Sequence, residues 1–333
     1  MSSAISGVEL VGRSISVDVP ATTANLGAGF DALSMALDLS SRVRVEAVGP
    51  DAHPDVLVEV TGEGRGLLPT GRRNRYILAL LEGLAAAGVD AGGIGWRVEM
   101  DNRIPVSRGL GSSASATVAA LVAADALVGG SLGRQRMLEL ATASEGHADN
   151  AAAALYGGLC VVAEVEGQPR VIRFDPPDGL LAALFVPDKH LSTAAMRAVL
   201  PDRVPFADAV HNVAAATMAL AALSQGRLEL LGAGTVDRLH EPYRAGAYPE
   251  LPELITAARV AGAQGACLSG AGSTVIAFSD DAAAAATIAA AMERRAVELG
   301  LDGRAAVQAA RADGARVIDD DDVRPGGSML GLA

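Results

Sequence analysis

Hydrophobic and polar residues alternate in four stretches of the first hundred residues. The stretches cover residues 15–19, 43–47, 56–60 and 96–100, and each places Val or another large apolar residue at every second position. A period of two residues is typical of β-strands that bury one face. The pattern therefore predicts four half-buried strands in this part of the chain.

Other segments repeat their apolar residues with the spacing of a helix. The segment 74–88 ends on a glycine that suits a helix C-cap, and a later helical pattern breaks at Gly146. The apolar segment 212–224 is short and is expected to be a buried helix. Predicted helices cover 74–88, 112–128, 134–146, 192–200, 206–226, 251–263 and 281–299. Predicted later strands lie in 157–165, 181–188, 274–280 and 305–310, with one more between the helix at 251–263 and the glycine-rich turn that follows it.

The order of these elements indicates an α+β protein, because strands, helices and strands follow in blocks rather than as βαβ units. The chain has 333 residues, enough for two fused domains. Composition changes around 166–177, which is rich in proline and charge. We therefore expect an N-terminal domain over 1–166 and a C-terminal domain over 167–318. The acidic and then Pro/Gly-rich tail, 319–333, is expected to be disordered.

Composition limits the environment and the partners. Half of the residues are hydrophobic but only 3% are aromatic, and the net charge is −12 without a basic block, which excludes a nucleic-acid partner. No signal segment precedes residue 15, and no uncharged apolar run reaches the roughly 18 residues of a membrane span. Cys160 and Cys267 lie far apart, so free buried thiols are favoured over a disulfide or metal pair. We expect a soluble, cytoplasmic protein that binds no membrane.

Three glycine-rich turns occupy residues 25–32, 109–116 and 268–275. The first two match the loose pattern G-x-G-x-x-[GA] of dinucleotide-binding folds. The first turn is followed too soon by a strand for a crossover helix, and the second lacks the strand that should come about 20 residues later. The one lysine of the chain is Lys189, and no G-x-x-x-x-G-K-[ST] motif occurs, which excludes a Walker-type loop.

The turn at 104–120, "IPVSRGLGSSASATVAA", has a physical explanation of its own. Gly109 and Gly111 let the backbone approach a ligand, and Ser112 or Ser113 opens a helix. The free N–H groups and positive dipole of a helix start bind anions, and a serine hydroxyl can also join a Mg²⁺ shell. The alternative is an ordinary serine-capped helix that binds nothing.

The three turns occur within the segments 19–37, 104–116 and 268–278. In this order they closely resemble the three motifs of the GHMP kinases, the small-molecule kinases of galactose, homoserine, mevalonate and phosphomevalonate. The resemblance spans roughly residues 13–310. It implies ATP as co-substrate, Mg²⁺ as cofactor and a homodimer. It also implies a two-domain α+β fold, ribosomal protein S5 domain 2-like at the N-terminus and a ferredoxin-like α/β sandwich at the C-terminus.

Segments between the motifs resemble the GHMP kinases that phosphorylate L-homoserine. These segments are 145–158, 186–201 and 239–251. Mevalonate-type members pair an early lysine with an aspartate base. In this chain no lysine precedes Lys189, and Asn150 stands at the position of that aspartate. The resemblance implies that the product is O-phospho-L-homoserine, an intermediate of threonine biosynthesis.

The resemblance also implies roles for single residues on the substrate side. The substrate carboxylate requires cations, and the planar fork of arginine suits it. The ammonium requires an anion, for which Asp31 is the candidate, with Asn25 beside it. The residues expected at the substrate are Asn25, Asp31, His147 as support for the loop, Asn150 and Thr193 near the hydroxyl, and Arg197 and Arg244 at the carboxylate.

On the nucleotide side, Asn74 is expected near the adenine. Mg²⁺ is expected at Ser113, with Ser112 as the alternative, and at Glu145, with Glu139 left open. Gly270 and Gly272 of the third motif are expected to brace the phosphate loop. That loop comprises Pro105, Val106, Ser107, Arg108, Gly109, Leu110, Gly111, Ser112, Ser113, Ala114 and Ser115.

The catalytic residues implied are Asn150, Thr193 and Arg197, and no side-chain base is evident. The hypothesis is that the hydroxyl proton leaves late, to the phosphate itself. Three alternatives remain open: a GHMP kinase with a mevalonate-type, diphosphocytidyl-alcohol or sugar substrate, a non-catalytic GHMP-like binding protein, and an NAD-binding oxidoreductase.

Overall fold

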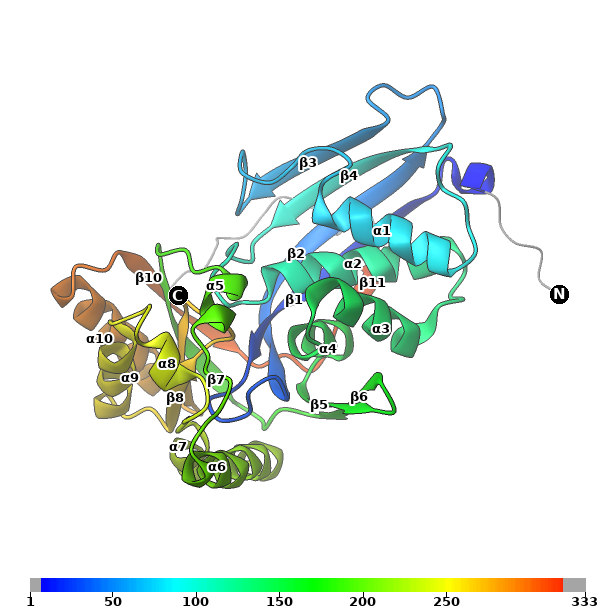
Figure 1. Cartoon of the computed structure of the whole chain (residues 1–333). Coiled ribbons are helices and arrows are strands. Elements are labelled where there is room, and N and C mark those ends of the chain that lie inside the picture. Colours follow the sequence, from blue (N-terminus) through cyan, green and yellow to red (C-terminus); the bar gives the residue numbers. More distant parts are fainter. Residues whose placement is uncertain (1–6, 320–333) are drawn as a thin grey trace.

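The computed structural model describes residues 7–319. Two units, each with its own β-sheet, lie side by side (Figure 1). The chain opens with a short 3-10 helix, Gly7–Leu10. The tail that was expected to be disordered, residues 319–333, lies outside the described residues except for Asp319.

The first unit contains a seven-stranded sheet. Its central path runs β11-β1-β2-β4-β3, and the β5–β6 hairpin joins at β2. Only β3 and β4 are parallel; the other pairs are antiparallel. The strands are β1 (Ser14–Ala24), β2 (Leu33–Val48), β3 (Val56–Gly62), β4 (Gly95–Asn102), β5 (Leu159–Val165), β6 (Gln168–Phe174) and β11 (Arg316–Ile318).

Four helices cover one face of this sheet (Figure 1). Because apolar residues alternate along the strands, one side of each strand is buried, and Val17, Val43 and Trp96 pack there beneath the helices. The helices are α1 (Arg75–Ala86), α2 (Ser112–Leu127), α3 (Gly133–Glu145) and α4 (Asp149–Tyr156).

The second unit is built on an antiparallel four-stranded sheet of order β10-β7-β9-β8. Helices α9 and α10 pack on this sheet. The strands are β7 (Leu181–Pro187), β8 (Gly265–Leu268), β9 (Val275–Ser279) and β10 (Gly303–Ala309), and the helices are α5 (Thr193–Ala198), α6 (Phe206–Gln225), a 3-10 turn (Leu228–Leu230), α7 (Leu231–Gly234), α8 (Glu241–Arg244), α9 (Leu251–Val260) and α10 (Ala282–Glu298).

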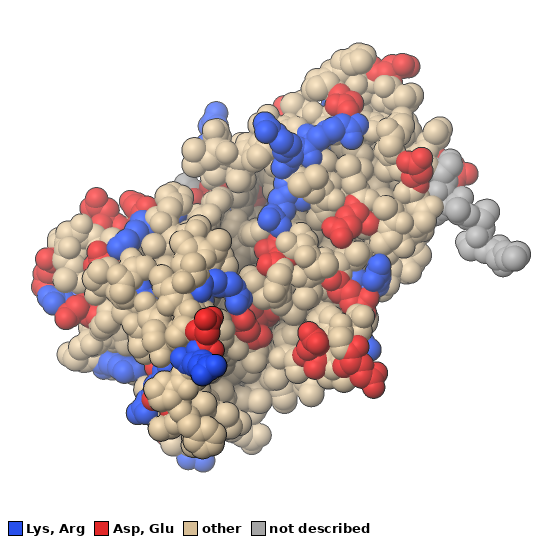
Figure 2. All heavy atoms as spheres, viewed as in Figure 1, with Lys and Arg blue, Asp and Glu red and all other residues tan. Residues whose placement is uncertain are grey.

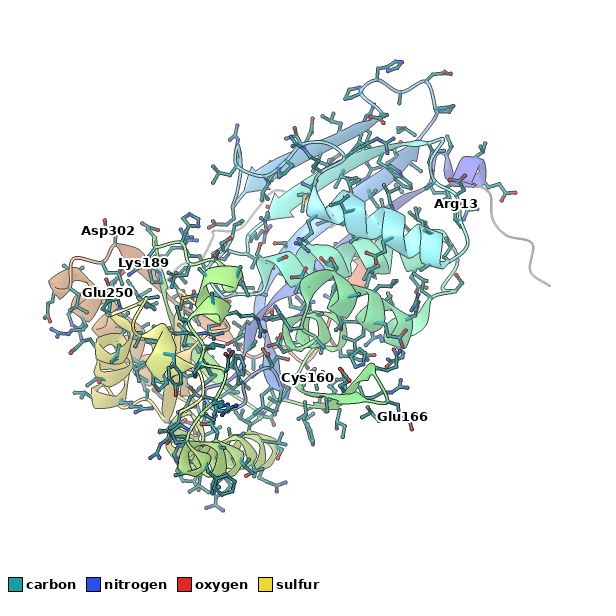
Figure 3. All side chains as sticks on the ribbon, viewed as in Figure 1. Arg13, Cys160, Glu166, Lys189, Glu250 and Asp302 are labelled. Carbon is teal, nitrogen blue, oxygen red and sulfur yellow. The ribbon has the colours of Figure 1, made fainter. Side chains whose placement is uncertain are left out.

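The domain boundary expected between residues 166 and 167 falls inside a β-hairpin. Glu166 and Gly167 form the two-residue turn between β5 and β6, and both have left-handed φ angles, 52° and 74°. Such turns connect strands tightly and do not act as linkers. Glu166 accordingly lies at the far tip of the hairpin in the first unit (Figure 3). Since β11 pairs with β1, we propose that the second unit begins after Phe174 and ends before Arg316.

Helix α6 has the predicted extent but is less buried than predicted. It has 20 residues and is long and apolar enough to span a membrane. Of its most apolar 18-residue stretch, 28% is buried inside the protein. Its inner face packs through Ala219, Ala222 and Leu223. The outer face exposes 84% of Phe206 and 68% of Val213. The expectation of a buried helix was therefore right for the inner face of α6 and wrong for its outer face.

The expectation of free, buried thiols is confirmed for Cys160 and Cys267. Burial raises the pKa of the Cys160 thiol to about 12, so this group stays protonated.

Candidate active site

A cavity of about 430 Å³ collects almost all of the predicted site residues. The surface is hollowed between the two units, and basic side chains flank the hollow (Figure 2). Pro105 and Leu110 are the exceptions: Pro105 lines a smaller neighbouring pocket, and Leu110 is fully buried in the core. The predicted residues that line the cavity are Asn25, Asp31, Asn74, Val106, Ser107, Arg108, Gly109, Gly111, Ser112, Ser113, Ala114, Ser115, Glu145, His147, Asn150, Thr193, Arg197 and Arg244.

Helix α2 begins with an open N-terminus at this cavity. Its N-cap is Gly111, with a φ of 70°, and no side chain accepts a hydrogen bond at this cap. The first bond of the helix runs from the N–H of Ser115 to the carbonyl of Gly111. The N–H groups of the first turn therefore remain available to an anion. The alternative of an ordinary serine-capped helix is excluded.

The glycines of the loop are required by the protein around them. A Cβ on Gly109 would lie 2.2 Å from the carbonyl oxygen of Ser269, and one on Gly111 would lie 1.9 Å from Thr22 Oγ1. Both residues also have left-handed φ angles. The sequence suggested that these glycines expose backbone to a ligand, but the structure shows that they let other segments pack against the loop.

The third glycine-rich turn braces the phosphate loop from behind. Ser269 Oγ lies 2.7 Å from the carbonyl oxygen of Gly109, to which it donates, and the N–H of Thr274 donates to the carbonyl of Arg108. A Cβ on Gly109 would also come within 3.0 Å of Gly272. The expected bracing by this motif therefore has a physical basis in direct contacts.

Glu145, and not Glu139, faces the start of α2. Its Oε1 accepts hydrogen bonds from Ser113 Oγ and Thr117 Oγ1, each at 3.0 Å, and from Arg75 Nη1 at 2.8 Å. Glu139 instead pairs with Arg136 on the same helix. Six residues separate the two glutamates on α3, so they point to different sides of the helix.

Asn74 is the N-cap of α1. Its Oδ1 accepts from the N–H of Tyr76 at 2.9 Å, and its Nδ2 donates to the carbonyl of Pro69 at 2.7 Å. The residue is 3% exposed and lines the cavity. Both ends of its amide are thus fixed by the protein.

Asp31 and Arg197 form a bidentate ion pair across the cavity. The two distances are 2.9 Å and 2.6 Å, and the pair joins the β1–β2 turn of the first unit to α5 of the second. Asn25 holds this turn, because its Oδ1 accepts from the N–H of Asp31 and its Nδ2 donates to the carbonyl of Gly270. The hydrogen bond to Asp31 raises the pKa of Arg197.

Arg244 is 2% exposed and pairs with no carboxylate of the described residues. Its Nη1 donates to the carbonyl of Gly270 and to His240 Nδ1, and its Nε donates to the carbonyl of Met196. Among residues 7–319 no group accepts a hydrogen bond from Nη2. Burial lowers the pKa of this guanidinium to about 10, as is expected of a cation without a counter-ion.

Phe30 lies between the two arginines. Its ring centroid is 5.6 Å from the guanidinium of Arg197 and 5.3 Å from that of Arg244, and it stacks on His240 at 5.1 Å. Cation–π contacts of this kind hold two like charges near each other. Phe30 is not among the residues predicted from the sequence, although it stands directly before Asp31 in the first motif.

His147, Asp149 and Asn150 form a connected group at the start of α4. Asp149 Oδ1 accepts from His147 Nδ1 at 2.8 Å and from Nδ2 of Asn150 at 3.2 Å, and the Oδ1 of Asn150 accepts from Thr22 Oγ1 at 2.7 Å. Asp149 and Thr22 were missed by the sequence analysis. The signal for Asp149 was a carboxylate two residues after a histidine that was itself singled out.

Thr193 is the first residue of α5 and lines the cavity on its exposed side. The one lysine is not among the cavity residues. Lys189 Nζ is 3.0 Å from Glu250 Oε2, and the two residues lie close together in the second unit (Figure 3). No group of three or more His, Cys, Asp or Glu side chains within 7–319 could hold a metal ion by itself.

Comparison with known proteins identifies the family. A model of the GHMP kinase N-terminal domain matches residues 75–158, and one of the C-terminal domain matches 219–298. The homoserine kinase of Moorella thermoacetica is 44% identical over 79% of this chain and 86% of its own length. That of Corynebacterium urealyticum is 40% identical over 90% of this chain and 97% of its own length.

The fold of this chain is also similar to that of solved homoserine kinases. The crystal structure of homoserine kinase from Cytophaga hutchinsonii superposes with a TM-score of 0.80 at 30% identity, covering 92% of this chain and 97% of that one. Three glycine-rich turns, which follow one another along the chain in the order of the family's motifs, meet at one cavity between the two units. On both grounds the chain belongs to the GHMP kinase family and has its two-domain α+β fold.

Proposed function

We propose that the protein transfers the γ-phosphoryl group of ATP to the primary hydroxyl of L-homoserine, giving O-phospho-L-homoserine for threonine biosynthesis. The observation that carries this proposal is Arg244, a buried cation with a free N–H edge at the cavity. A carboxylate would supply the missing counter-ion and accept from that edge. The names of the curated relatives support the same substrate.

The charged groups around the cavity match a zwitterionic amino acid. The carboxylate would bind Arg244 and Arg197, and the ammonium would bind Asp31, which now pairs with Arg197. A zwitterion carries both charges that this ion pair contains, so each protein charge keeps a partner of opposite sign when substrate binds. Mevalonate and sugars lack the ammonium, which weighs against these substrates.

For the nucleotide, the first turn of α2 would hold the phosphates, and Asn74 would lie near the base. Mg²⁺ is held in kinases by one or two carboxylates together with substrate phosphates, and Glu145 with the Ser113 hydroxyl fits this donor set. When bound, the ion neutralises charge on the phosphates. Glu145 and Ser113 are the residues that would hold it.

The side chains of this chain position the reactants. Asn150 would lie at the substrate hydroxyl together with Thr193, and Arg197 would steady both the substrate and the developing charge. The Oδ1 of Asn150 already accepts from Thr22, so its amide offers an N–H donor and cannot act as a base. Positioning and charge neutralisation supply most of the acceleration in phosphoryl transfer. The hydroxyl proton can therefore leave late, to the transferred phosphate.

An ATP-consumption assay across L-homoserine, threonine, mevalonate and galactose tests the proposal. We expect turnover with L-homoserine at least about tenfold above the others, since galactose leaves the buried arginine unpaired, mevalonate lacks the ammonium, and the hydroxyl of threonine is secondary and one carbon nearer the ammonium. Absence of turnover above background with L-homoserine would overturn it. Turnover with mevalonate instead would favour the alternative GHMP kinase.

We further propose a homodimer in the cytoplasm that forms through the outer face of α6. That face carries a continuous stripe of uncharged residues at helical spacing: Phe206, Ala207, Val210, Val213, Ala214, Thr217, Met218 and Ala221. A second copy of the same stripe across a two-fold axis would cover it. The free thiols Cys160 and Cys267 suit the reducing cytoplasm.

A further inference from the structure

Asp149 is a buried carboxylate at the edge of the cavity. The residue is 2% exposed, and its backbone carbonyl accepts from Ser34 Oγ at 2.7 Å, which fixes its place against β2. Its Oδ1 accepts from the N–H of Asn150 at 2.6 Å. Its other partners are His147 and the side chain of Asn150, two residues that face the cavity.

The hydrogen bonds of Asp149 decide which nitrogen of His147 carries a proton. An ionised carboxylate only accepts hydrogen bonds, so Nδ1 of His147 carries a hydrogen and donates it. The hydrogen bond to Asp149 also raises the pKa of His147, and above that pKa the ring is neutral and its Nε2 is an acceptor. Nδ1 is taken by the buried Asp149 while the residue lines the cavity, which leaves Nε2 as the ring nitrogen available to a ligand there.

The same carboxylate decides the orientation of the Asn150 amide. Nδ2 donates to Asp149, and Oδ1 accepts from Thr22 Oγ1. A flipped amide would place its oxygen against the carboxylate of Asp149, where two acceptors would repel each other. The second hydrogen on Nδ2 is thereby left for a ligand.

The chain of bonds also reaches the nucleotide side. A Cβ placed on Gly111, the N-cap of α2, would lie 1.9 Å from Thr22 Oγ1 and 3.2 Å from Asn150 Oδ1. Thr22 and Asn150 therefore pack directly beneath the phosphate loop. One hydrogen-bonded chain, Thr22–Asn150–Asp149–His147, joins the helix start to the substrate side.

We propose that Asp149 is a positioning residue that sets one acceptor, His147 Nε2, and one donor, Asn150 Nδ2, toward the substrate. This inference rests on the proposed function for the group that His147 and Asn150 contact, which is the hydroxyl of L-homoserine. A hydroxyl group both donates and accepts one hydrogen bond, so an adjacent acceptor and donor hold it in a single orientation. In this role Asp149 acts through His147 and Asn150.

Asp149→Asn tests the proposal, because an amide keeps the shape but can present N–H to His147 Nδ1. Long-range ¹H–¹⁵N NMR of the nucleotide-free protein reports the histidine tautomers, and the signals lost in His147→Gln assign the ring. At a pH above the raised pKa of His147, where the ring is neutral, we expect the Nδ1–H form in the wild type and a shift to the Nε2–H form in Asp149→Asn. This measurement needs no substrate.

The kinetic arm uses the same variant. We expect kcat to fall by about 100-fold, since misplaced reacting groups lose about that much, with the KM for ATP changed less than about threefold. Asp125→Asn is the matched control: Asp125 Oδ1 accepts from the N–H of Leu132, far from the cavity. It should lower stability without lowering kcat more than about twofold.

A second pair of variants tests the other end of the chain without changing a charge. Thr22→Val removes the donor to Asn150 and should lower kcat by about tenfold, the effect of one lost hydrogen bond. Thr22→Ser keeps the hydroxyl and should restore it. If Asp149→Asn does not fold, these two variants still test the proposal.

An unchanged tautomer in Asp149→Asn, or kcat within threefold of the wild type in both Asp149→Asn and Thr22→Val, would overturn the inference. If the wild type fails to phosphorylate L-homoserine while the tautomer shifts, the proposed function fails and the positioning stands.

Discussion

At the scale of single residues, Glu241 is a buried carboxyl group on the same short helix as Arg244. Its Oε1 accepts from the N–H of Leu268 at 2.6 Å. Burial raises the pKa of this carboxyl to about 8, with Asp237 adding to the rise. Between the ordinary value of 4.5 and about 8, the folded protein therefore keeps a proton that the unfolded chain has released.

This difference makes stability depend on pH. The contribution of Glu241 is fully present below about pH 4.5 and is lost as the pH rises through 8, because the unfolded state binds fewer protons. We expect Glu241→Gln to gain stability relative to the wild type as the pH rises from 6 to 8. Urea unfolding of both proteins across this range measures it. A constant difference between them would contradict the expectation.

Gly111 is a second residue with a sharp prediction. An alanine there meets Thr22 Oγ1 at 1.9 Å and must adopt a φ of 70°. Gly129 has a φ of 80° but nothing within 4 Å of an added Cβ. We expect Gly129→Ala to cost only the backbone strain, about 1 kcal/mol. Gly111→Ala should cost more and lower activity, as thermal unfolding and the ATP assay will show.

Arg244→Lys asks whether the buried cation binds the substrate carboxylate. Lysine keeps a charge but loses the planar fork. We expect the KM for L-homoserine to rise about 10- to 100-fold, the range for a charged hydrogen bond, and the KM for ATP to change less than about threefold. Arg238→Ala, which loses a surface ion pair with Asp208, is the control. Equal effects on both KM values would refute the assignment.

At the scale of elements, α3 carries two candidate magnesium ligands on different sides. We expect Glu145→Gln to raise the half-saturating Mg²⁺ concentration about tenfold or more, since it removes the carboxylate beside Ser113. Glu139→Gln should leave it unchanged. Binding of Mn²⁺ in the presence of ADP measures the site without turnover. A reversed order of the two variants would assign the metal to Glu139.

The sequence predicted the long elements well and the short ones poorly. Alternation at 15–19 and 96–100 predicted β1 and β4, since one face of each is buried. It could not predict β6, whose burial pattern is mostly exposed, or α8, which has four residues. The motifs predicted which residues line the cavity. They could not show that Asp31 pairs with Arg197, because that contact joins residues 166 positions apart.

At the scale of the whole molecule, the outer face of α6 predicts how copies associate. Val213→Glu places a charge in the middle of the apolar stripe, where 68% of the valine is exposed. We expect it to convert a dimer to a monomer, as sedimentation or light scattering will show. Val260→Glu, at an isolated valine that is 84% exposed on α9, should leave the mass unchanged. A wild type that is monomeric at high concentration would refute the dimer.

The pairing of β11 with β1 has a mechanical consequence. Ser16 aligns with Ile318, and Arg311 Nη2 lies 2.6 Å from Asp18 Oδ2, so both ends of the described chain are fastened to one sheet. The second unit is an insertion looped out between β6 and β11. A force applied at the two ends would load the β1–β11 pair first, and the second sheet would bear no tension until that pair had separated.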